Sequence, residues 1–254
     1  MPTLKQLIKK HPTYLAQVER WTILEKLVAG GAKVDLEVRK TLLQNPDNRP
    51  TKIIEARAKN STYVNVLGST ANRIVAQLFQ DPANFEGSDD QFWTNWLENT
   101  AFVLDADDDA KASFTLGLKE AVMLALTNGK AIAEISTRFS GEATNLKQQK
   151  ELGELDPYIV LLPQTAMWDW DTDSKGFKYA KICRYRLERS GWTADDIPVY
   201  SFTIYERSPQ GKIVVSQYEV RPNPNNESYK TPANLKIDSA QQDDVLISVV
   251  QAGG

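Results

Sequence analysis

The sequence predicts an α+β protein in which a helical N-terminal half is followed by an antiparallel β hairpin or meander. Apolar residues recur at helical spacing up to about residue 128, and they alternate at every second position from residue 177 onward. Glycine- and proline-containing stretches separate these segments, as turns require. We therefore expect a helical part at residues 1–129 and a mainly β part at residues 130–254.

The first helices are expected to be short and bounded by proline and glycine. Leu4, Leu7 and Ile8 have helical spacing, and Pro12 suits the first turn of a second helix. Gly30-Gly31 ends that helix, because glycine accepts the left-handed conformation past a helix end. Its apolar stripe is predicted to contain Leu15, Val18, Trp21, and Leu24 or Leu27. A further short helix or turn is expected within residues 34–43.

Residues 51–80 form the longest predicted helical stretch, which Asp81-Pro82 ends. Gly68 weakens its middle by about 1 kcal/mol relative to alanine, so we expect any break or kink there. The aromatic-rich segment 92–102 is then predicted to form one short helix. The last helix of this half runs to Asn128-Gly129, with Asp107–Asp109 at its N-terminus, where carboxylates meet unpaired backbone N–H groups.

The second half contains the predicted strands. Residues 130–138 and 157–162 are expected to form strands, the second of which ends at Pro163. Strict alternation over 177–188 is repeated over 199–206 and 212–220, and the turn residues Ser208–Gly211 join the last two segments. These patterns predict an antiparallel hairpin or meander, and residues 245–250 predict a last strand. Residues 140–155 and 221–234 are expected to be loops.

Composition excludes several classes of protein. The chain has 254 residues and a net charge of −3 from 30 basic and 33 acidic residues, so it lacks the basic excess typical of nucleic-acid binders. A single cysteine excludes an intrachain disulfide, and a single histidine excludes a multi-histidine metal site. No apolar run approaches the ~18–20 residues that span a bilayer. We expect a soluble protein that is made inside a cell and uses no cofactor.

Motif analysis argues against an enzyme. The glycine-rich phosphate-binding fingerprints are absent from the sequence. The segment Asp169–Gly176 resembles a calcium loop, but its ligand spacing is broken and a strand-to-strand turn is the better interpretation. His11 is interpreted as a surface or capping residue, because no Gly-x-Ser-x-Gly nucleophile motif accompanies it. Cys183 lies on the Tyr179/Tyr185 side of its strand and is interpreted as a small buried hydrophobe.

Three groups of side chains each allow more than one role. An acidic cluster could hold Mg²⁺ for a nuclease or could cap a helix; it comprises Asp105, Asp107, Asp108 and Asp109. An aromatic cluster could stack on bases or could form core; it comprises Phe92, Trp93, Trp96 and Phe102. A basic face could contact phosphate or a neighbouring subunit, or could be solvated; it comprises Lys178, Arg184 and Arg186, with Lys181 nearby.

The order of several short motifs resembles the N-terminal, or wing, part of tailed-phage portal proteins, the head–tail connectors. The first motif is Trp21-x-x-Leu24-x-x-Leu27-x-x-Gly30-Gly31, followed by Tyr63-x-Asn65 on a helix that ends near Leu78-Phe79-x-x-Pro82. Ala125-x-x-Asn128-Gly129-Lys130-Ala131 is similar to the helix-to-strand junction of the family, and the segment from Leu155 to Asp169 is similar to its following strand pair. The long hairpin at 177–220 also resembles a family feature.

The resemblance covers roughly residues 12–220 and implies a ring, usually of twelve subunits, at one capsid vertex in the virion. It implies passage of double-stranded DNA through the ring without sequence-specific binding or bond chemistry, and no contact with a membrane. It further implies a major capsid protein, a terminase large subunit and a tail adaptor as partners, and synthesis in the host cytoplasm. Portal chains continue through a stem and a clip, whereas this sequence stops about where the stem would begin. The channel-lining residues of the family are therefore not assigned to positions of this sequence.

Residue type alone suggests which side chains could lie at a subunit interface, because aromatic and arginine residues favour the buried centre of such contacts. These candidates are Trp93, Trp96, Arg184, Arg186 and Tyr205. Two other functions remain open at the level of sequence: a Mg²⁺-dependent nuclease that uses the cluster from Asp105 to Asp109, and another scaffold or adaptor protein of a virion.

Overall fold

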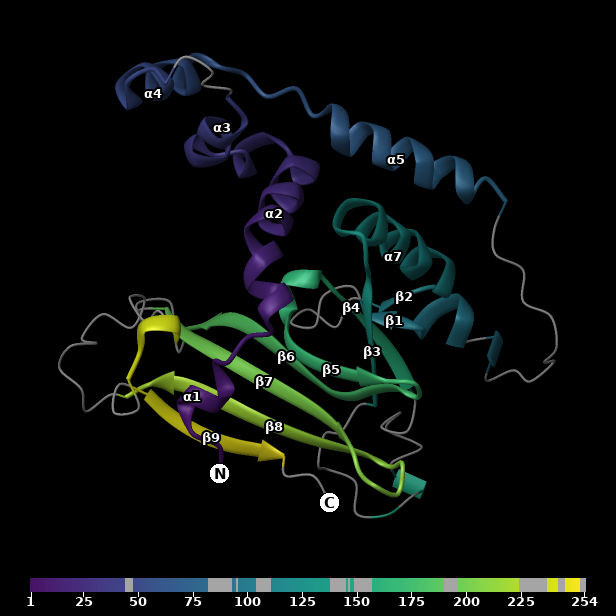
Figure 1. Ribbon diagram of the computed structural model, residues 1–254. Helices are drawn as coiled ribbons and strands as arrows, with labels where there is room; N and C mark the ends of the chain where they lie inside the picture. The colour runs from purple at the N-terminus through teal and green to yellow at the C-terminus, as the bar shows by residue number, and fades with distance from the viewer. Residues whose placement is uncertain are drawn as a thin grey trace. The chain divides into compact units, whose positions relative to one another are not determined.

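A computed structural model describes residues 1–43, 48–81, 93–94, 96–103, 111–137, 145, 147–148, 157–189, 196–223, 237–241 and 245–251 (Figure 1). Helices dominate the first part of the chain and antiparallel strands the second, so the predicted α+β class is confirmed. The chain forms two compact units, one of residues Met1–Val18 and Thr165–Gly254 and the other of residues Glu19–Gln164. These units do not coincide with the expected division at 129/130, because the N-terminal segment groups with the late strands and the early strands group with the helices.

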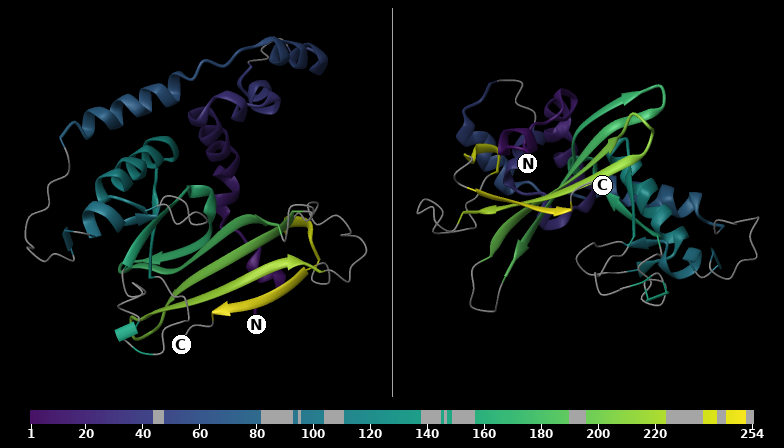
Figure 2. Two further views of the ribbon diagram at one scale, coloured as in Figure 1. Left: turned by 180° about the vertical axis from the view of Figure 1, so that it is seen from behind. Right: turned by 90° about the horizontal axis from the view of Figure 1, so that it is seen from below.

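The first unit is built on a five-stranded antiparallel sheet, whose strands follow one another in chain order (Figure 1). Figure 2 shows the twist of these strands from behind and from below. The predicted meander at 177–220 and the predicted last strand are confirmed. The strands are β5 (Met167–Asp173), β6 (Gly176–Glu188), β7 (Ile197–Arg207), β8 (Ile213–Pro222) and β9 (Val245–Gln251).

The register places the largest buried side chains at the centre of this sheet. Phe202 of β7 lies opposite Cys183 of β6 and is fully buried, as are Val199 and Val220. Two short helical segments belong to the same unit, α1 (Leu4–Leu7) and η6 (Ile237–Ser239). Both leucines of α1 are buried, and so is Ile237. The predicted turn over Asp169–Gly176 is shorter than expected, because Asp169–Asp173 belongs to β5 and the chain turns only between Asp173 and Gly176, where Gly176 takes a positive φ of 105°.

Helices form most of the second unit. They are α2 (Pro12–Ala29), of which the residues from Glu19 onward belong here, η1 (Gly31–Lys33), α3 (Leu36–Leu42), α4 (Thr51–Asn60), α5 (Val66–Leu78) and α7 (Phe114–Asn128). Leu27, Val34 and Val38 form a buried cluster against which Tyr63 packs. Leu15 of the predicted α2 stripe is 62% exposed, so its inclusion in the buried stripe is wrong.

The predicted helix over 51–80 is broken, but Gly68 does not cause the break. The chain leaves helical conformation at Ser61, after α4, and resumes it at Val66, where Asn65 is the N-cap. Gly68 lies inside α5 and is buried. The polar and β-branched segment 61–65 therefore separates the two helices, since its side chains favour caps and extended backbone over helix interior.

A small sheet packs with the last helix of this unit. Its order is β2-β1-β4-β3, in which β1 runs parallel to β4 and the other pairs are antiparallel. Its strands are β1 (Phe102–Val103), β2 (Lys111–Ala112), β3 (Ile132–Thr137) and β4 (Pro157–Leu162). The Phe102 ring lies 5.4 Å from the Phe114 ring, and a Cβ added at Gly117 of α7 would lie 2.1 Å from it. Glycine at 117 thus lets α7 approach β1.

Two sequence expectations for this region need correction. The aromatic segment does not form one helix, because a π-helical turn, η2 (Trp96–Thr100), is followed by β1 at Phe102. Ser113, not Asp107–Asp109, caps α7, since the Ser113 side chain accepts the Leu116 N–H and β2 intervenes. The predicted end of α7 at Gly129 is confirmed by its φ of 80°. Phe92, the cluster from Asp105 to Asp109 and most of both predicted polar loops lie outside the described residues.

Candidate functional site

The C-terminal end of α2 is held by side chains from the segment between α4 and α5. The Tyr63 hydroxyl donates a hydrogen bond to the Leu27 carbonyl oxygen at 2.9 Å. The Asn65 side-chain amide donates to the Val28 carbonyl oxygen, also at 2.9 Å. The last carbonyls of a helix have no partner within the helix. Two side chains therefore satisfy the end of α2 and fix it against the start of α5.

Asn65 also begins α5, because its Oδ1 accepts the Gly68 N–H at 2.8 Å. This double role brings the backbones close together. A Cβ added at Gly68 would lie 2.4 Å from the Val28 carbonyl oxygen, and one added at Gly30 would lie 2.5 Å from the Asn65 amide nitrogen. We call Leu27, Val28, Gly30, Tyr63, Asn65 and Gly68 the α2–α5 joint. The quoted motif residues Leu27, Gly30, Tyr63 and Asn65 thus converge at one place.

Helix α5 has one wide apolar face, of which one part is buried and the other part is exposed. Gly68, Ala71 and Val75 are buried. Leu67, Ile74 and Leu78 are spaced by seven and four residues, so they lie together on the part of the same apolar face that borders Ala71, and they are 38%, 39% and 63% exposed. Arg73 is the single charged residue within Val66–Leu78. An apolar face that is only partly buried within the chain leaves side chains available to a further element. We call Leu67, Ile74 and Leu78 the α5 stripe.

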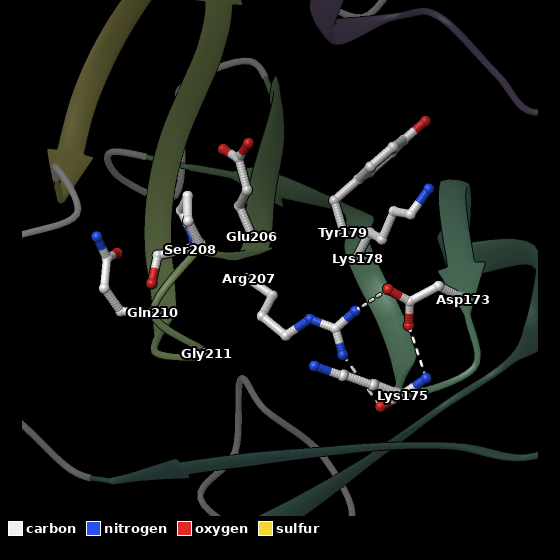
Figure 3. A pocket seen from close by; sticks show the side chains of 10 residues that line it. Asp173, Lys175, Lys178, Tyr179, Glu206, Arg207, Ser208, Gln210 and Gly211 are labelled. Carbon is white, nitrogen blue, oxygen red and sulfur yellow. Dashed lines mark hydrogen bonds and ion pairs between the residues drawn. The ribbon is translucent and has the colours of Figure 1, made fainter.

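A pocket of about 670 Å³ lies at one end of the five-stranded sheet, where the β5–β6 and β7–β8 turns approach each other (Figure 3). Figure 3 shows the Arg207 side chain directed toward Asp173. Arg207 pairs with the Asp173 carboxylate at 2.5 Å and donates to the Lys175 carbonyl oxygen at 3.0 Å. Lys178 pairs with Asp171 at 3.0 Å.

These contacts determine the electrostatics of the pocket. The hydrogen bond from Arg207 holds the pKa of Asp173 below its ordinary value, and that from Lys178 does the same for Asp171. Both carboxylates are thereby kept ionised, and each neutralises a neighbouring cation. Arg207 and Lys178 are thus paired with carboxylates of the same sheet. The arrangement of the pocket ties two turns together.

Four charged side chains form a closed ion-pair network on one face of the same sheet. Arg186 of β6 bonds to Glu188 at 2.7 Å and to Glu219 of β8 at 2.6 Å. Arg221 bonds to the same two carboxylates, at 2.6 and 2.9 Å. The hydrogen bond from Arg186 lowers the pKa of Glu188. Burial opposes ionisation of Glu219, but hydrogen bonds from Arg221 and Arg186 outweigh it, so its pKa is also lowered. We call these four residues the charge ladder.

The predicted basic face is not a free cationic surface. Lys178 is paired with Asp171, and Arg186 belongs to the charge ladder. Lys181 is 4% exposed and lies on the opposite face of β6, with its ammonium 4.0 Å from the Asp169 carboxylate. Its Nζ donates to the carbonyl oxygens of Gln6 and Lys9. The sequence pattern suggested a contact surface, but these cations neutralise carboxylates or fasten the N-terminal segment within the chain.

The five interface candidates fall into two groups. Trp93 is 44% exposed and meets Trp96 edge-on at 5.7 Å, and the Trp96 indole donates to the Pro157 carbonyl oxygen. Trp96 also packs against the Phe114 ring, which supports the interpretation of this cluster as core. Arg184, Arg186 and Tyr205 are half-buried on one face of the five-stranded sheet. Their role at an interface remains a prediction.

His11 and Cys183 have the structural roles expected from the sequence. His11 Nδ1 accepts the Thr13 N–H at 3.1 Å at the start of α2, and its ring also stacks on Trp170 at 4.2 Å. Cys183 is buried, and burial raises the pKa of its thiol, which therefore stays protonated and unreactive. Within the described part of the chain, no group of three or more His, Cys, Asp or Glu side chains is placed to hold a metal ion.

Sequence reasoning missed two residues that organise these sites. Lys181 was grouped with exposed cations, although its position on the Cys183 side of β6 was a signal of burial. Asn65 was noted only as part of a motif; its position just before a helix marked it as a cap. Its second bond, to Val28, has no local signal.

No protein-family model matches the chain, and no curated protein sequence matches it. Among the described helices, none combines the length and the apolar character needed to cross a lipid bilayer. The functional interpretation therefore rests on the residues and their arrangement.

Proposed function

We propose that the chain is a structural subunit of a phage portal, the ring at a capsid vertex through which DNA is packaged and ejected. The observation that carries the proposal is the α2–α5 joint. Leu27, Gly30, Tyr63 and Asn65 belong to the short motifs that resemble the portal wing, and they lie together at this joint. Tyr63 donates to the Leu27 carbonyl oxygen at 2.9 Å, Asn65 donates to the neighbouring Val28 carbonyl oxygen at 2.9 Å, and the Asn65 side chain lies close against Gly30. Because residues from separate motifs meet in one contact, a shared structural role explains the motifs better than chance matches do.

The α5 stripe supports self-association. A ring closes through heterologous contacts, in which each subunit presents two different surfaces to its neighbours. Such a contact needs an apolar centre, which Leu67, Ile74 and Leu78 offer on a helix with a single charge. The net charge of −3 suits a channel wall, because DNA must slide through it without its phosphates being held. In this proposal the protein acts by geometry, while a terminase, a capsid protein and a tail adaptor dock on the ring.

The direct test is the assembly state of the purified chain, measured by light scattering and by negative-stain imaging. We expect closed rings, usually of twelve subunits, with a central channel wide enough for double-stranded DNA.

Immunogold labelling of particles should place the protein at a single vertex. Labelling spread over the capsid surface would instead identify a scaffold or adaptor. Mg²⁺-dependent DNA cleavage that is lost in an Asp107→Ala/Asp109→Ala variant would overturn the proposal in favour of the nuclease.

A further inference from the structure

Asn128 and Gly129 lie where α7 ends, and they are the one Asn-Gly pair in the sequence. In such a pair the backbone nitrogen of the glycine can attack Cγ of the asparagine, because glycine has no side chain to hinder the approach. The N–Cγ bond forms, the Cγ–Nδ2 bond breaks, and ammonia leaves with the amide proton of the glycine. Water then opens the cyclic imide to aspartate or isoaspartate. Asn128 therefore has the chemistry of a deamidation site.

The folded end of α7 opposes this reaction. The Gly129 N–H donates a hydrogen bond to the Ala125 carbonyl oxygen at 2.9 Å, so the attacking nitrogen is engaged in the helix. Asn128 is the last helical residue, and imide closure requires its backbone to rotate out of the helical region so that the Gly129 nitrogen reaches Cγ. Gly129 in turn holds the left-handed φ of 80° that ends the helix. The reaction must therefore wait until this end of α7 opens.

The Asn128 side chain is buried and has a fixed orientation. It is 7% exposed, and its Nδ2 donates to a Glu25 carboxylate oxygen of α2 at 3.1 Å. Its Oδ1 accepts no hydrogen bond from the described residues. This environment suits an amide nitrogen that faces a carboxylate. An ionised aspartate at position 128 has no proton to donate, and it places a second negative charge beside Glu25 and at the C-terminal end of a helix, where negative charge is unfavourable.

These contacts carry one inference: we propose that Asn128 is a deamidation site that folding closes, and that its conversion prevents the end of α7 from packing again beside Glu25. Aspartate is repelled by the Glu25 carboxylate. Isoaspartate adds a carbon atom to the main chain directly before Gly129, where the helix must end. Deamidation is thus a one-way record that this junction has opened. The proposal concerns a single chain and does not depend on the proposed ring.

The first test needs no variant. The wild type is incubated at neutral pH, either native or unfolded in urea, and its peptides are analysed by mass spectrometry for aspartate and isoaspartate at position 128. We expect conversion to be slower in the native protein by about tenfold or more, since a helix end that is open in about a tenth of the molecules already gives this factor. Equal rates would overturn the protection by the fold. Aspartate without isoaspartate would contradict the imide route.

The second test supplies the product directly. Asn128→Asp should lower the melting temperature by about 2–4 °C or more. The matched control is Asn72→Asp, which adds the same charge at an exposed position of α5 and should have a smaller effect. Glu25→Gln added to Asn128→Asp should restore most of the loss, measured against Glu25→Gln alone, because the repulsion is removed. An Asn128→Asp chain as stable as the wild type, or one that Glu25→Gln does not restore, would overturn the proposal.

Discussion

The ammonium group of Lys181 donates a hydrogen bond to the backbone carbonyl oxygen of Gln6 at 3.2 Å, from a side chain that is only 6% exposed. Lys181 also donates to the Lys9 carbonyl oxygen and lies 4.0 Å from Asp169. Burial lowers the pKa of Lys181, because the charged form is poorly solvated there, while the nearby Asp169 carboxylate partly opposes the shift. One lysine thus fastens the N-terminal segment of the chain to the middle of β6.

We expect Lys181→Met to lower the free energy of unfolding by about 2–4 kcal/mol. Methionine fills a similar volume but leaves two carbonyl oxygens without their donor and Asp169 buried without its cation. Urea unfolding followed by tryptophan fluorescence measures the change. Lys178→Met is the matched control, since Lys178 is half-exposed and its pair with Asp171 is screened by solvent and should contribute little to stability. Equal losses in both variants would contradict the anchoring role.

Gly68→Ala should destabilise the protein, although the same change within most helices stabilises them by up to about 1 kcal/mol. The new Cβ would lie 2.4 Å from the Val28 carbonyl oxygen, so the α2–α5 joint must open. We expect a loss of about 1–3 kcal/mol, as for other overpacked sites. Thr70→Ala, at an exposed position of the same helix, should change stability by only a few tenths of a kcal/mol. Thermal melts of the two variants measure the difference, and a stabilised Gly68→Ala would show that the joint can adapt.

The sequence predicted best those features that depend on neighbours along the chain. Alternation over 177–220 located the strands, and Gly129 located the end of α7, because both are local properties of the backbone. Gly68 and Lys181 were misjudged for the opposite reason. Their roles depend on the Val28, Gln6 and Lys9 carbonyl oxygens, which the fold alone brings near. Local propensity therefore indicated a weak helix at 68 and an exposed cation at 181.

The charge ladder should make stability depend on pH through Glu188 and Glu219. In the folded chain the pKa values of both carboxyl groups lie below the ordinary 4.5. At a pH between the folded and the unfolded pKa of each group, the unfolded chain therefore binds more protons than the folded chain. The stabilisation is complete above 4.5 and is lost as the pH falls below 4.5 and through the folded values. At neutral pH, Glu219→Gln should cost about 1–2 kcal/mol, because it removes the acceptor of two charged donors.

Melting temperatures measured from neutral pH downward check this expectation. The wild type should lose more stability below 4.5 than Glu219→Gln, which no longer has the carboxyl group that is protonated there. Glu206→Gln, an exposed residue of the neighbouring strand β7, should follow the wild type. Parallel curves for the wild type and Glu219→Gln would show that the ladder does not contribute to acid sensitivity.

The α5 stripe should decide whether rings form. We expect Ile74→Glu/Leu78→Glu to lower the mass in solution from that of the ring without unfolding the chain, because both side chains are exposed in the single subunit and would be buried only against a neighbour. The matched control is Leu116→Glu/Leu126→Glu on α7, whose leucines are 43% and 47% exposed. Light scattering measures the mass and circular dichroism the helix content. A ring that persists with two glutamates on α5 would exclude this helix from the contact, while loss of assembly in the control alone would move the contact to α7.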